Sequence, residues 1–105
     1  MTLYLYRLQA TRPAMLGSGP TPEEAVVLDQ HQAYLEDLKA RDVILLAGRT
    51  QTTDYSTFAL VLFRAESEGE ARRVVSDDPA VVARLMRAEL YPYRVNLIGD
   101  LSHLT

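Results

Sequence analysis

Two helix-start signals, each lying between apolar segments of strand length, constrain the fold of this chain more than any other feature. Residues 21–24 (TPEE) supply an N-cap hydroxyl, a proline at the first helical position and a glutamate placed for a capping box. Residues 67–70 (SEGE) repeat the capping-box pattern in the second half of the chain. Each half is therefore predicted to run strand, helix, strand.

The segments around these signals predict four strands and two helical segments. Apolar side chains recur at helical spacing from residue 22 to about 41, and a second helix is expected over residues 68–75, with a restart at Asp78 and Pro79. Pro92 lies within the last predicted strand and favours an edge position or a bulge there. The predicted strands cover residues 3–8, 43–47 (closed by Gly48), 57–64 and 89–98.

This order of elements is typical of an α+β fold. Right-handed crossovers would place both helical segments on one face of a four-stranded antiparallel sheet, which gives a ferredoxin-like βαββαβ sandwich. We expect one domain over residues 1–105, with a folded core over 1–99 and a tail over 100–105. The strands carry more apolar surface than one helical layer can cover, so we expect a homodimer that buries the second sheet face.

Charge and composition exclude several classes of function. A net charge of −3 argues against a nucleic-acid backbone or an anionic membrane as the partner. The absence of cysteine excludes disulfides and thiolate metal sites, and two histidines make a poor ligand set, so no metal or cofactor is expected. The sequence shows no signal-peptide pattern, and its longest apolar runs are too short to span a bilayer. We therefore expect a cytoplasmic protein.

His31 is the strongest candidate for chemistry. It lies in the middle of the first predicted helix, between Leu28 and Leu35, on the stripe expected to face the sheet. An imidazole changes its protonation near physiological pH, which suits a general acid or base. The alternative is a core histidine whose ring nitrogens bond to structural partners. His103, in the tail, carries no such prediction.

Asp78 has two interpretations as well. An aspartate before Pro79 is what capping of the second helical segment would select. A pairing with His31 is the alternative, because each residue lies nine or ten positions beyond its own helix start, or about 13–15 Å along the helix axis. Packed helices lie about 8–10 Å apart, so the two side chains should be able to form a direct or water-bridged hydrogen bond.

Three further residues are candidates for binding a substrate. Arg12 lies in residues 10–21, a long segment rich in Pro, Gly and Ser that we expect to border the pocket and to be more mobile than the strands. Arg49 follows the second strand, and either guanidinium would suit an acidic substrate. Tyr34 lies near His31 by helical spacing and offers a hydroxyl. The alternatives are surface charges for the two arginines and a packed ring for the tyrosine.

Several short motifs follow one another along the chain: His31, Tyr34, Leu35 and Leu38, then Leu46-Ala47-Gly48, residues 67–71 (SEGEA), Asp78-Pro79 and residues 90–93 (LYPY). Their order and spacing resemble the YCII-related (YciI-like) family over about residues 3–98. The resemblance implies a dimeric α+β barrel of ferredoxin-like subunits, related to muconolactone-isomerase-like enzymes. In that family a helix-borne histidine and the aspartate of an Asp-Pro pair are the catalytic candidates, which match His31 and Asp78.

One departure from the family pattern bears on the site. Many relatives carry a serine before the glycine that follows the second strand, often with a proline after it. This chain has Ala47 before Gly48 and Arg49 after it, which removes a hydroxyl and adds a cation. A mechanism that needs the serine is therefore not expected here, and Arg49 gains weight as a substrate contact.

Together these features predict a small-molecule enzyme of lyase, isomerase or dehydrohalogenase type that acts on a small acidic or phenolic substrate. His31 would move the proton, and Asp78 would orient the imidazole and stabilise its charged form. The competing interpretation is a non-catalytic dimeric ligand-binding or interaction module in which His31 is a core residue. The surroundings of the imidazole distinguish the two, because only the enzyme needs the ring to open into a polar pocket.

Overall fold

The computed structural model describes residues 2–104 of the chain. A single sheet is built from β1 (Thr2–Ala10), β2 (Ile44–Arg49), β3 (Ala59–Ala65) and β4 (Met86–Tyr93). The helices are α1 (Ala14–Gly17), α2 (Pro22–Ala40), α3 (Glu68–Ser76) and α4 (Pro79–Val82), followed by the 3₁₀ helix η1 (Leu101–His103).

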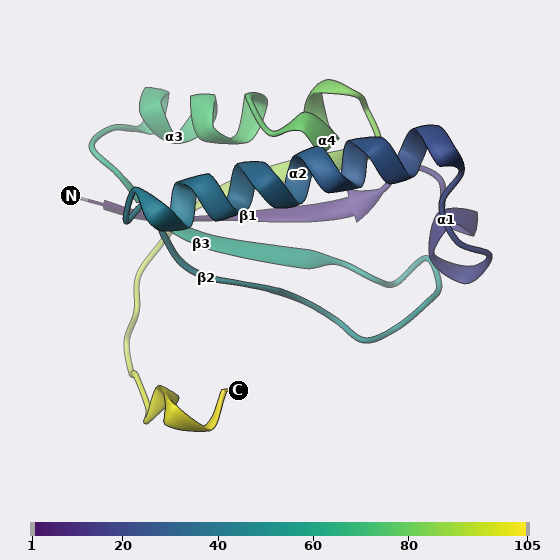
Figure 1. The fold of residues 1–105 in the computed structure, drawn as a ribbon. Helices are drawn as coiled ribbons and strands as arrows, with labels where there is room; N and C mark the ends of the chain where they lie inside the picture. The colour runs from purple at the N-terminus through teal and green to yellow at the C-terminus, as the bar shows by residue number, and fades with distance from the viewer. Residues whose placement is uncertain (1, 105) are drawn as a thin grey trace.

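The sheet is antiparallel throughout, with the strand order β2-β3-β1-β4. Helices α2, α3 and α4 lie on one face of it, as Figure 1 shows. This is the ferredoxin-like α+β sandwich predicted from the order of the elements. Pro92 lies in β4, which is an edge strand, so its missing N–H does not interrupt the ladder to a further strand. None of the helices within residues 2–104 is long and apolar enough to cross a membrane.

The core lies between the sheet and the helical layer. Alternate side chains of the two central strands point into it, because successive residues of a strand face opposite sides. The Tyr6 ring meets the Phe63 ring edge-on, with 5.6 Å between the centroids. The buried members of this cluster are Tyr4, Tyr6 and Leu8 of β1, Val61, Phe63 and Ala65 of β3, and Ala71 of α3.

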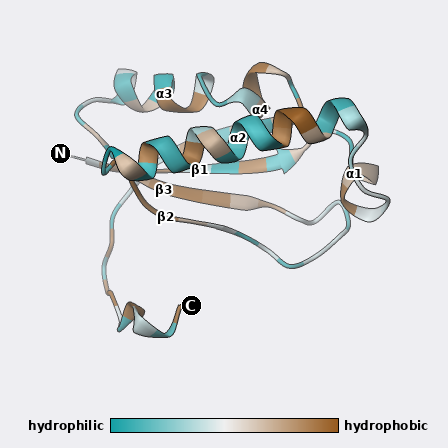
Figure 2. Cartoon of the chain, viewed as in Figure 1, coloured by the Kyte–Doolittle hydropathy of each residue, from teal (hydrophilic) through white to brown (hydrophobic). Residues whose placement is uncertain are grey.

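The opposite face of the sheet has no cover within the part of the chain that is described. Leu46, Tyr91 and Tyr93 are exposed there, and an apolar groove of about 460 Å³ runs across β2, β3 and β1. Figure 2 shows that β3 is hydrophobic along most of its length, although only one of its faces meets the helices. The C-terminal segment extends away from the sheet on the side opposite the helices (Figure 1). It also exposes apolar side chains, with Leu97 93% and Ile98 74% accessible.

The strand boundaries differ from those expected from sequence, and pairing explains the largest difference. We predicted a last strand over residues 89–98, but β4 begins at Met86 and ends at Tyr93. Met86 is opposite Ala10 and Tyr93 is opposite Leu3, so β4 ends one residue before the first described residue of β1, Thr2.

Two other boundaries are also corrected. The second strand does not close at Gly48 but continues to Arg49, which is opposite Ala59. The third strand was predicted from Thr57 and begins instead at Ala59. The predicted loop over residues 10–21 contains helix α1, because Met15 inserts into the core and is almost fully buried. Short helices in proteins depend on tertiary packing, and the burial of Met15 provides it for α1.

Candidate active site

His31 lies halfway along α2, on the side of the helix that faces the sheet. The capping box predicted at the start of this helix is present, with the Thr21 hydroxyl accepting from the backbone of Glu24 and the Glu24 carboxylate accepting from the backbone of Thr21. The imidazole is only 12% exposed, and its remaining accessible surface lines a pocket. The cap thus defines where α2 begins, and packing against the sheet directs His31 into the interior.

Asp78 meets the imidazole from behind, on the side away from the pocket. Its Oδ1 lies 2.7 Å from His31 Nδ1 and also accepts the backbone N–H of Ala80 at 2.9 Å. Its Oδ2 accepts the Tyr6 hydroxyl at 2.9 Å. The carboxylate is wholly buried, and it accepts from the Tyr6 hydroxyl and the Ala80 N–H besides its contact with His31. The cap and the pairing with His31, which appeared as alternatives from sequence, are both present.

The contact with Asp78 determines which ring nitrogen of His31 donates. An ionised carboxylate only accepts hydrogen bonds, so a ring nitrogen in contact with it is the donor. In the neutral imidazole Nδ1 then carries the proton that is donated to Asp78, and Nε2 carries the free lone pair. Within residues 2–104 Nε2 makes no hydrogen bond. This is the tautomer that a general base on the pocket side requires.

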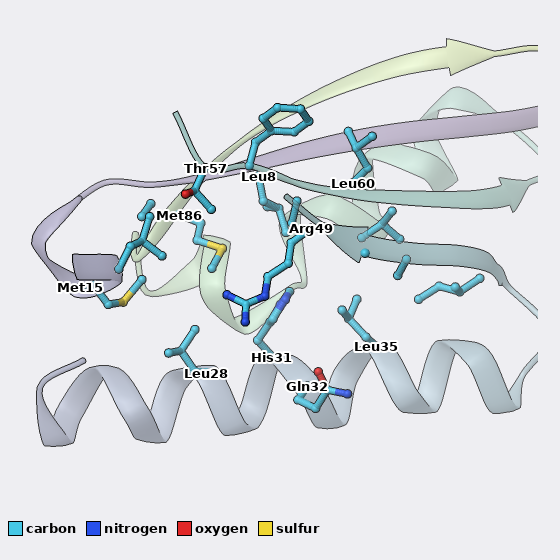
Figure 3. Close-up of a pocket in the computed structure, with 18 of the residues that line it drawn as sticks. Leu8, Met15, Leu28, His31, Gln32, Leu35, Arg49, Thr57, Leu60 and Met86 are labelled. Carbon is cyan, nitrogen blue, oxygen red and sulfur yellow. The ribbon is translucent and has the colours of Figure 1, made fainter. Parts of the chain in front are cut away.

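The pocket beside His31 has a volume of about 930 Å³ and lies between α2 and the ends of β2 and β3. Figure 3 shows the apolar side chains of Leu28 and Leu35 flanking His31 on α2. Met15 of α1 and Met86 of β4 close one end of the pocket in the same view. Its lining is mostly apolar with a few polar groups, as is usual for small-molecule sites. The polar side chains among its lining residues are His31, Gln32, Glu36, Lys39, Arg49, Thr52, Thr53 and Thr57.

Arg49 is the predicted substrate contact that the fold brings to this pocket. Its position opposite Ala59 directs the side chain to the helix-covered side of β2. Figure 3 shows the guanidinium reaching from the strand toward His31. In the described part of the chain no carboxylate pairs with it. The pocket thus contains a cation that is turned toward the imidazole.

Tyr34 is not part of the pocket wall. Its hydroxyl donates to the backbone carbonyl of Val74 at 2.7 Å and thereby ties α2 to α3. Burial, followed by the nearby charges of Asp77 and Asp78, raises the pKa of this hydroxyl to about 12. The packed ring, which was the alternative from sequence, is the arrangement observed. Helix α2 packs against α4 and the sheet, and Tyr34 reaches α3 through this hydrogen bond.

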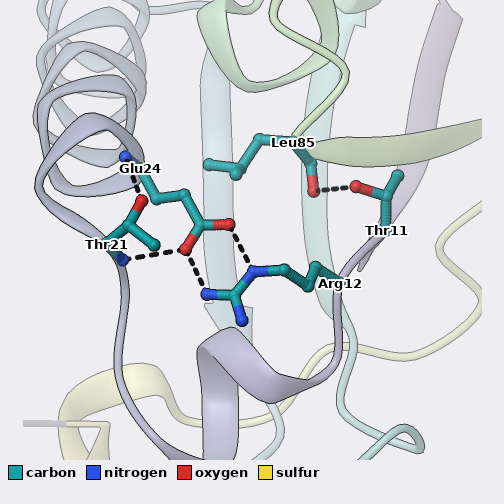
Figure 4. Close-up of polar contacts among 5 residues, drawn as sticks. All are labelled: Thr11, Arg12, Thr21, Glu24 and Leu85. Carbon is teal, nitrogen blue, oxygen red and sulfur yellow. Dashed lines mark hydrogen bonds and ion pairs between the residues drawn. The ribbon is translucent and has the colours of Figure 1, made fainter.

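Arg12 is also directed away from the pocket. Its guanidinium forms a two-pronged ion pair with the Glu24 carboxylate, which at the same time completes the capping box with Thr21 (Figure 4). The Arg12 side chain and then the Thr21 backbone hold the pKa of Glu24 at about 2. The pair fastens the segment before α1 to the start of α2. Residues 10–21 do border the pocket, through Ala10, Met15, Leu16, Gly19 and Pro20.

Two polar residues of this region were missed from sequence. Tyr6 reads as one of several apolar positions of β1, and the only available signal was that a buried tyrosine hydroxyl needs a partner. Thr57 is almost fully buried, and its hydroxyl lies 2.7 Å from that of Thr52 on the pocket wall. Nothing in the polar connection around these threonines distinguishes them from solvated residues. Residues 2–104 contain no cluster of three or more carboxylate, histidine or cysteine side chains that could hold a metal ion.

Comparison with solved structures identifies a similar enzyme. The chain is 27% identical to 5-chloro-2-hydroxyhydroquinone dehydrochlorinase (TftG) from Burkholderia phenoliruptrix AC1100, solved in complex with 2,5-dihydroxybenzoquinone. The match covers 88% of this chain and 93% of that chain, with a TM-score of 0.65. SnoaB, a cofactor-independent oxygenase from Streptomyces nogalater, is 13% identical over 92% of this chain and 94% of its own, with a TM-score of 0.48.

The family comparison covers most of the sequence. No curated protein sequence matches the chain. The model of the YCII-related domain matches residues 3–93, which include every strand but the first residue of β1, together with His31, Arg49 and Asp78. The chain therefore belongs to the YCII-related family.

Proposed function

We propose that this protein is an acid–base enzyme of lyase, isomerase or dehydrohalogenase type that acts on a small acidic or phenolic compound. His31 is the base, Asp78 orients its ring, and Arg49 binds a negatively charged oxygen of the substrate. The observation that carries the proposal is the 2.7 Å contact between the imidazole and a wholly buried carboxylate, with the same imidazole lining a pocket. A histidine with a purely structural role does not need an open side.

The buried carboxylate supports the role of His31 in two ways. It holds Nδ1 in its protonated form, so that Nε2 is available to take a proton from a bound molecule. It also stabilises the imidazolium that results, because the opposite charges lie close together where water does not screen them. Both effects favour the transition state for proton transfer.

Arg49 supports the choice of an acidic or phenolic substrate. Its guanidinium is the cation that Figure 3 shows turned toward His31, and the surrounding lining is largely apolar. A cation within an apolar lining suits an aromatic ring that carries an ionised oxygen. The ring would pack against the leucines and methionines, and the oxygen would bind the guanidinium. The negative charge that develops when a phenol or an acidic C–H loses its proton would be stabilised there.

The similarity to a dehydrochlorinase is consistent with this chemistry. Elimination of HCl requires a base that takes a proton while chloride leaves with the electron pair of its bond to carbon. Loss of HCl involves no net electron transfer to an external acceptor. The named substrate of the similar enzyme is a chlorinated polyhydroxybenzene, which is a phenolic compound of the expected size.

The proposal includes a homodimer in which two sheets meet through their uncovered faces. Leu46, Tyr91 and Tyr93 remain exposed on that face, beside the groove over β2, β3 and β1. A contiguous apolar face of this kind is typical of an interaction surface. A second copy presents the same surface, so a dimer with two-fold symmetry would bury the uncovered sheet face of both copies. The apolar C-terminal segment would contribute to the same contact.

An activity assay tests the proposed function. The chain is incubated with 5-chloro-2-hydroxyhydroquinone and with a panel of small phenols and aromatic acids, and chloride release and the absorbance of the products are followed against buffer alone. We expect turnover of at least one compound by the natural sequence. His31→Gln should lower kcat by about 100-fold or more, because it removes the base and keeps a side chain of similar size.

A matched variant separates this role from a general effect of losing a histidine. His103→Gln changes the exposed histidine of η1 and should leave kcat unchanged. Turnover that survives in His31→Gln would contradict the assignment of the base. Tight binding of a phenol without turnover by the natural sequence would favour a ligand-binding module instead.

A further inference from the structure

Tyr6 is a buried tyrosine whose hydroxyl makes one hydrogen bond among the described residues, to Asp78. The side chain lies in the middle of β1, faces the helices and is fully buried. Its ring packs edge-on against Phe63, a contact that a phenylalanine would make equally well. The hydroxyl donates to Asp78 Oδ2 at 2.9 Å, 72 residues away in sequence. Packing alone therefore does not require the oxygen, and its cost of burial is offset only by Asp78.

The carboxylate of Asp78 is held from two directions by different elements. Oδ1 is held by the first turn of α4 through the Ala80 N–H, and Oδ2 is held by β1 through Tyr6. The contacts of Ala80 and His31 both fall on Oδ1, so without Tyr6 the plane of the carboxylate would be free to turn about the bond to its β carbon. The Tyr6 hydroxyl removes this freedom, and Oδ1 is then fixed at hydrogen-bond distance from His31 Nδ1. None of the polar atoms of Tyr6 or Asp78 is part of the pocket lining.

We infer that Tyr6 is a positioning residue for His31, acting through Asp78, and that it sets the strength of the hydrogen bond between the carboxylate and the imidazole. This inference rests on the proposed function only where turnover is concerned. The arrangement forms a chain of three side chains from β1, the start of α4 and the middle of α2 to the pocket. The hydrogen bond from the Tyr6 hydroxyl stabilises negative charge on Oδ2. Less negative charge is then left on Oδ1, which is the atom that accepts from His31.

The direction of the Tyr6 hydrogen bond is fixed by its environment. Burial, followed by the negative charge of Asp78, raises the pKa of the Tyr6 hydroxyl far above its ordinary value. The hydroxyl therefore keeps its proton and remains a donor throughout the physiological range. Removing it leaves Asp78 with two donors in place of three, and the unshared charge then acts on the Nδ1–H of His31.

Nuclear magnetic resonance of the full chain with ¹⁵N-labelled histidine tests this inference without a substrate. In the natural sequence we expect His31 to be protonated at Nδ1, with a downfield proton signal typical of a bond to a carboxylate. Tyr6→Phe should move that signal further downfield, because Oδ1 becomes the stronger acceptor. Incorporation of 3-fluorotyrosine at position 6, a stronger donor of the same shape, should move it upfield.

Tyr4→Phe is the matched control. Tyr4 lies on the same strand and the same face, is almost fully buried, and its hydroxyl makes no side-chain hydrogen bond within residues 2–104. Its replacement should leave the His31 signal in place. If Tyr6→Phe or the fluorinated residue leaves the signal where Tyr4→Phe leaves it, Tyr6 is a packing residue only and the inference is wrong.

A kinetic measurement adds a second readout once a substrate is known. Tyr6→Phe should lower kcat by about tenfold, because a carboxylate held only through Oδ1 no longer keeps the imidazole in one orientation. KM should not change, because Tyr6 does not reach the pocket. A rise in KM of about the same factor would contradict a positioning role. Failure to find any substrate would count against the proposed function and would leave the resonance result to decide on Tyr6.

Discussion

At the scale of single residues, Asp78 carries out two tasks that the sequence presented as alternatives. One oxygen caps α4 and meets His31, and the other accepts from Tyr6. The proline that follows it keeps the residue extended, with φ of −62° and ψ of 122°, and so turns the carboxylate out of the helical ladder. A helix start is thus used to place a charge beside the imidazole.

Arg49 gives a prediction at the same scale. Replacing it with glutamine should raise KM for an anionic substrate by about tenfold or more, because one charge-assisted contact is lost, with a smaller effect on kcat. Arg49→Lys should recover part of the affinity, since an ammonium keeps the charge but not the planar fork. The measurement is KM for ionised and neutral analogues of one compound.

The control for Arg49 is Arg72→Gln, which removes an exposed arginine from α3, outside the pocket lining. It should bind both analogues as the natural sequence does. If Arg49→Gln bound the ionised analogue as tightly as the natural sequence does, the guanidinium would not contact the substrate.

At the scale of elements, the segment that leads into α2 is held by charge. Arg12 and the backbone of Thr21 stabilise the ionised Glu24 carboxylate, and its pKa falls from an ordinary 4.5 to about 2. A carboxyl whose pKa is lower in the folded chain than in the unfolded chain stabilises the fold above the unfolded value. That contribution is lost as the pH falls from about 4.5 toward about 2.

Glu24→Gln should therefore be less stable than the natural sequence at neutral pH, and the difference should narrow on acidification. The measurement is the thermal midpoint of both chains over this range of pH. Glu23→Gln is the control, because the Glu23 carboxylate makes no hydrogen bond among the residues described, and its curve should follow that of the natural sequence. Parallel curves for Glu24→Gln and the natural sequence across the range would contradict the prediction.

At the scale of the whole molecule, the uncovered sheet face predicts a dimer. Light scattering on a sizing column should give twice the chain mass of 11.8 kDa. Leu62 lies opposite Leu5 on that face and lines its groove, so Leu62→Asp should yield a folded monomer, because it places a charge in the contact. Val26→Asp, an equal change on an exposed position of α2, should remain dimeric. A monomeric natural sequence at micromolar concentration would exclude the dimeric barrel.

The sequence by itself determined the order of the elements, the start of both main helices and the presence of His31 on the inward side of α2. These properties depend on signals that act within one or two turns, such as a cap hydroxyl, a proline at the first helical position and an apolar repeat. The strand ends were less predictable. β4 ends at Tyr93, close to the end of its partner β1, and the sequence near Tyr93 contains no information on the length of that partner strand.

The composition of the pocket was decided only by the tertiary structure. Arg12 and Arg49 look alike in sequence, yet one is held by Glu24 and the other faces His31. The difference follows from the register of β2 against β3 and from the fold of residues 10–21. Similarly, Tyr6 and Asp78 are 72 residues apart, and Asp78 and His31 are 47 apart. Such contacts depend on how whole elements pack, since side-chain direction follows from register and helix rotation rather than from neighbours in the chain.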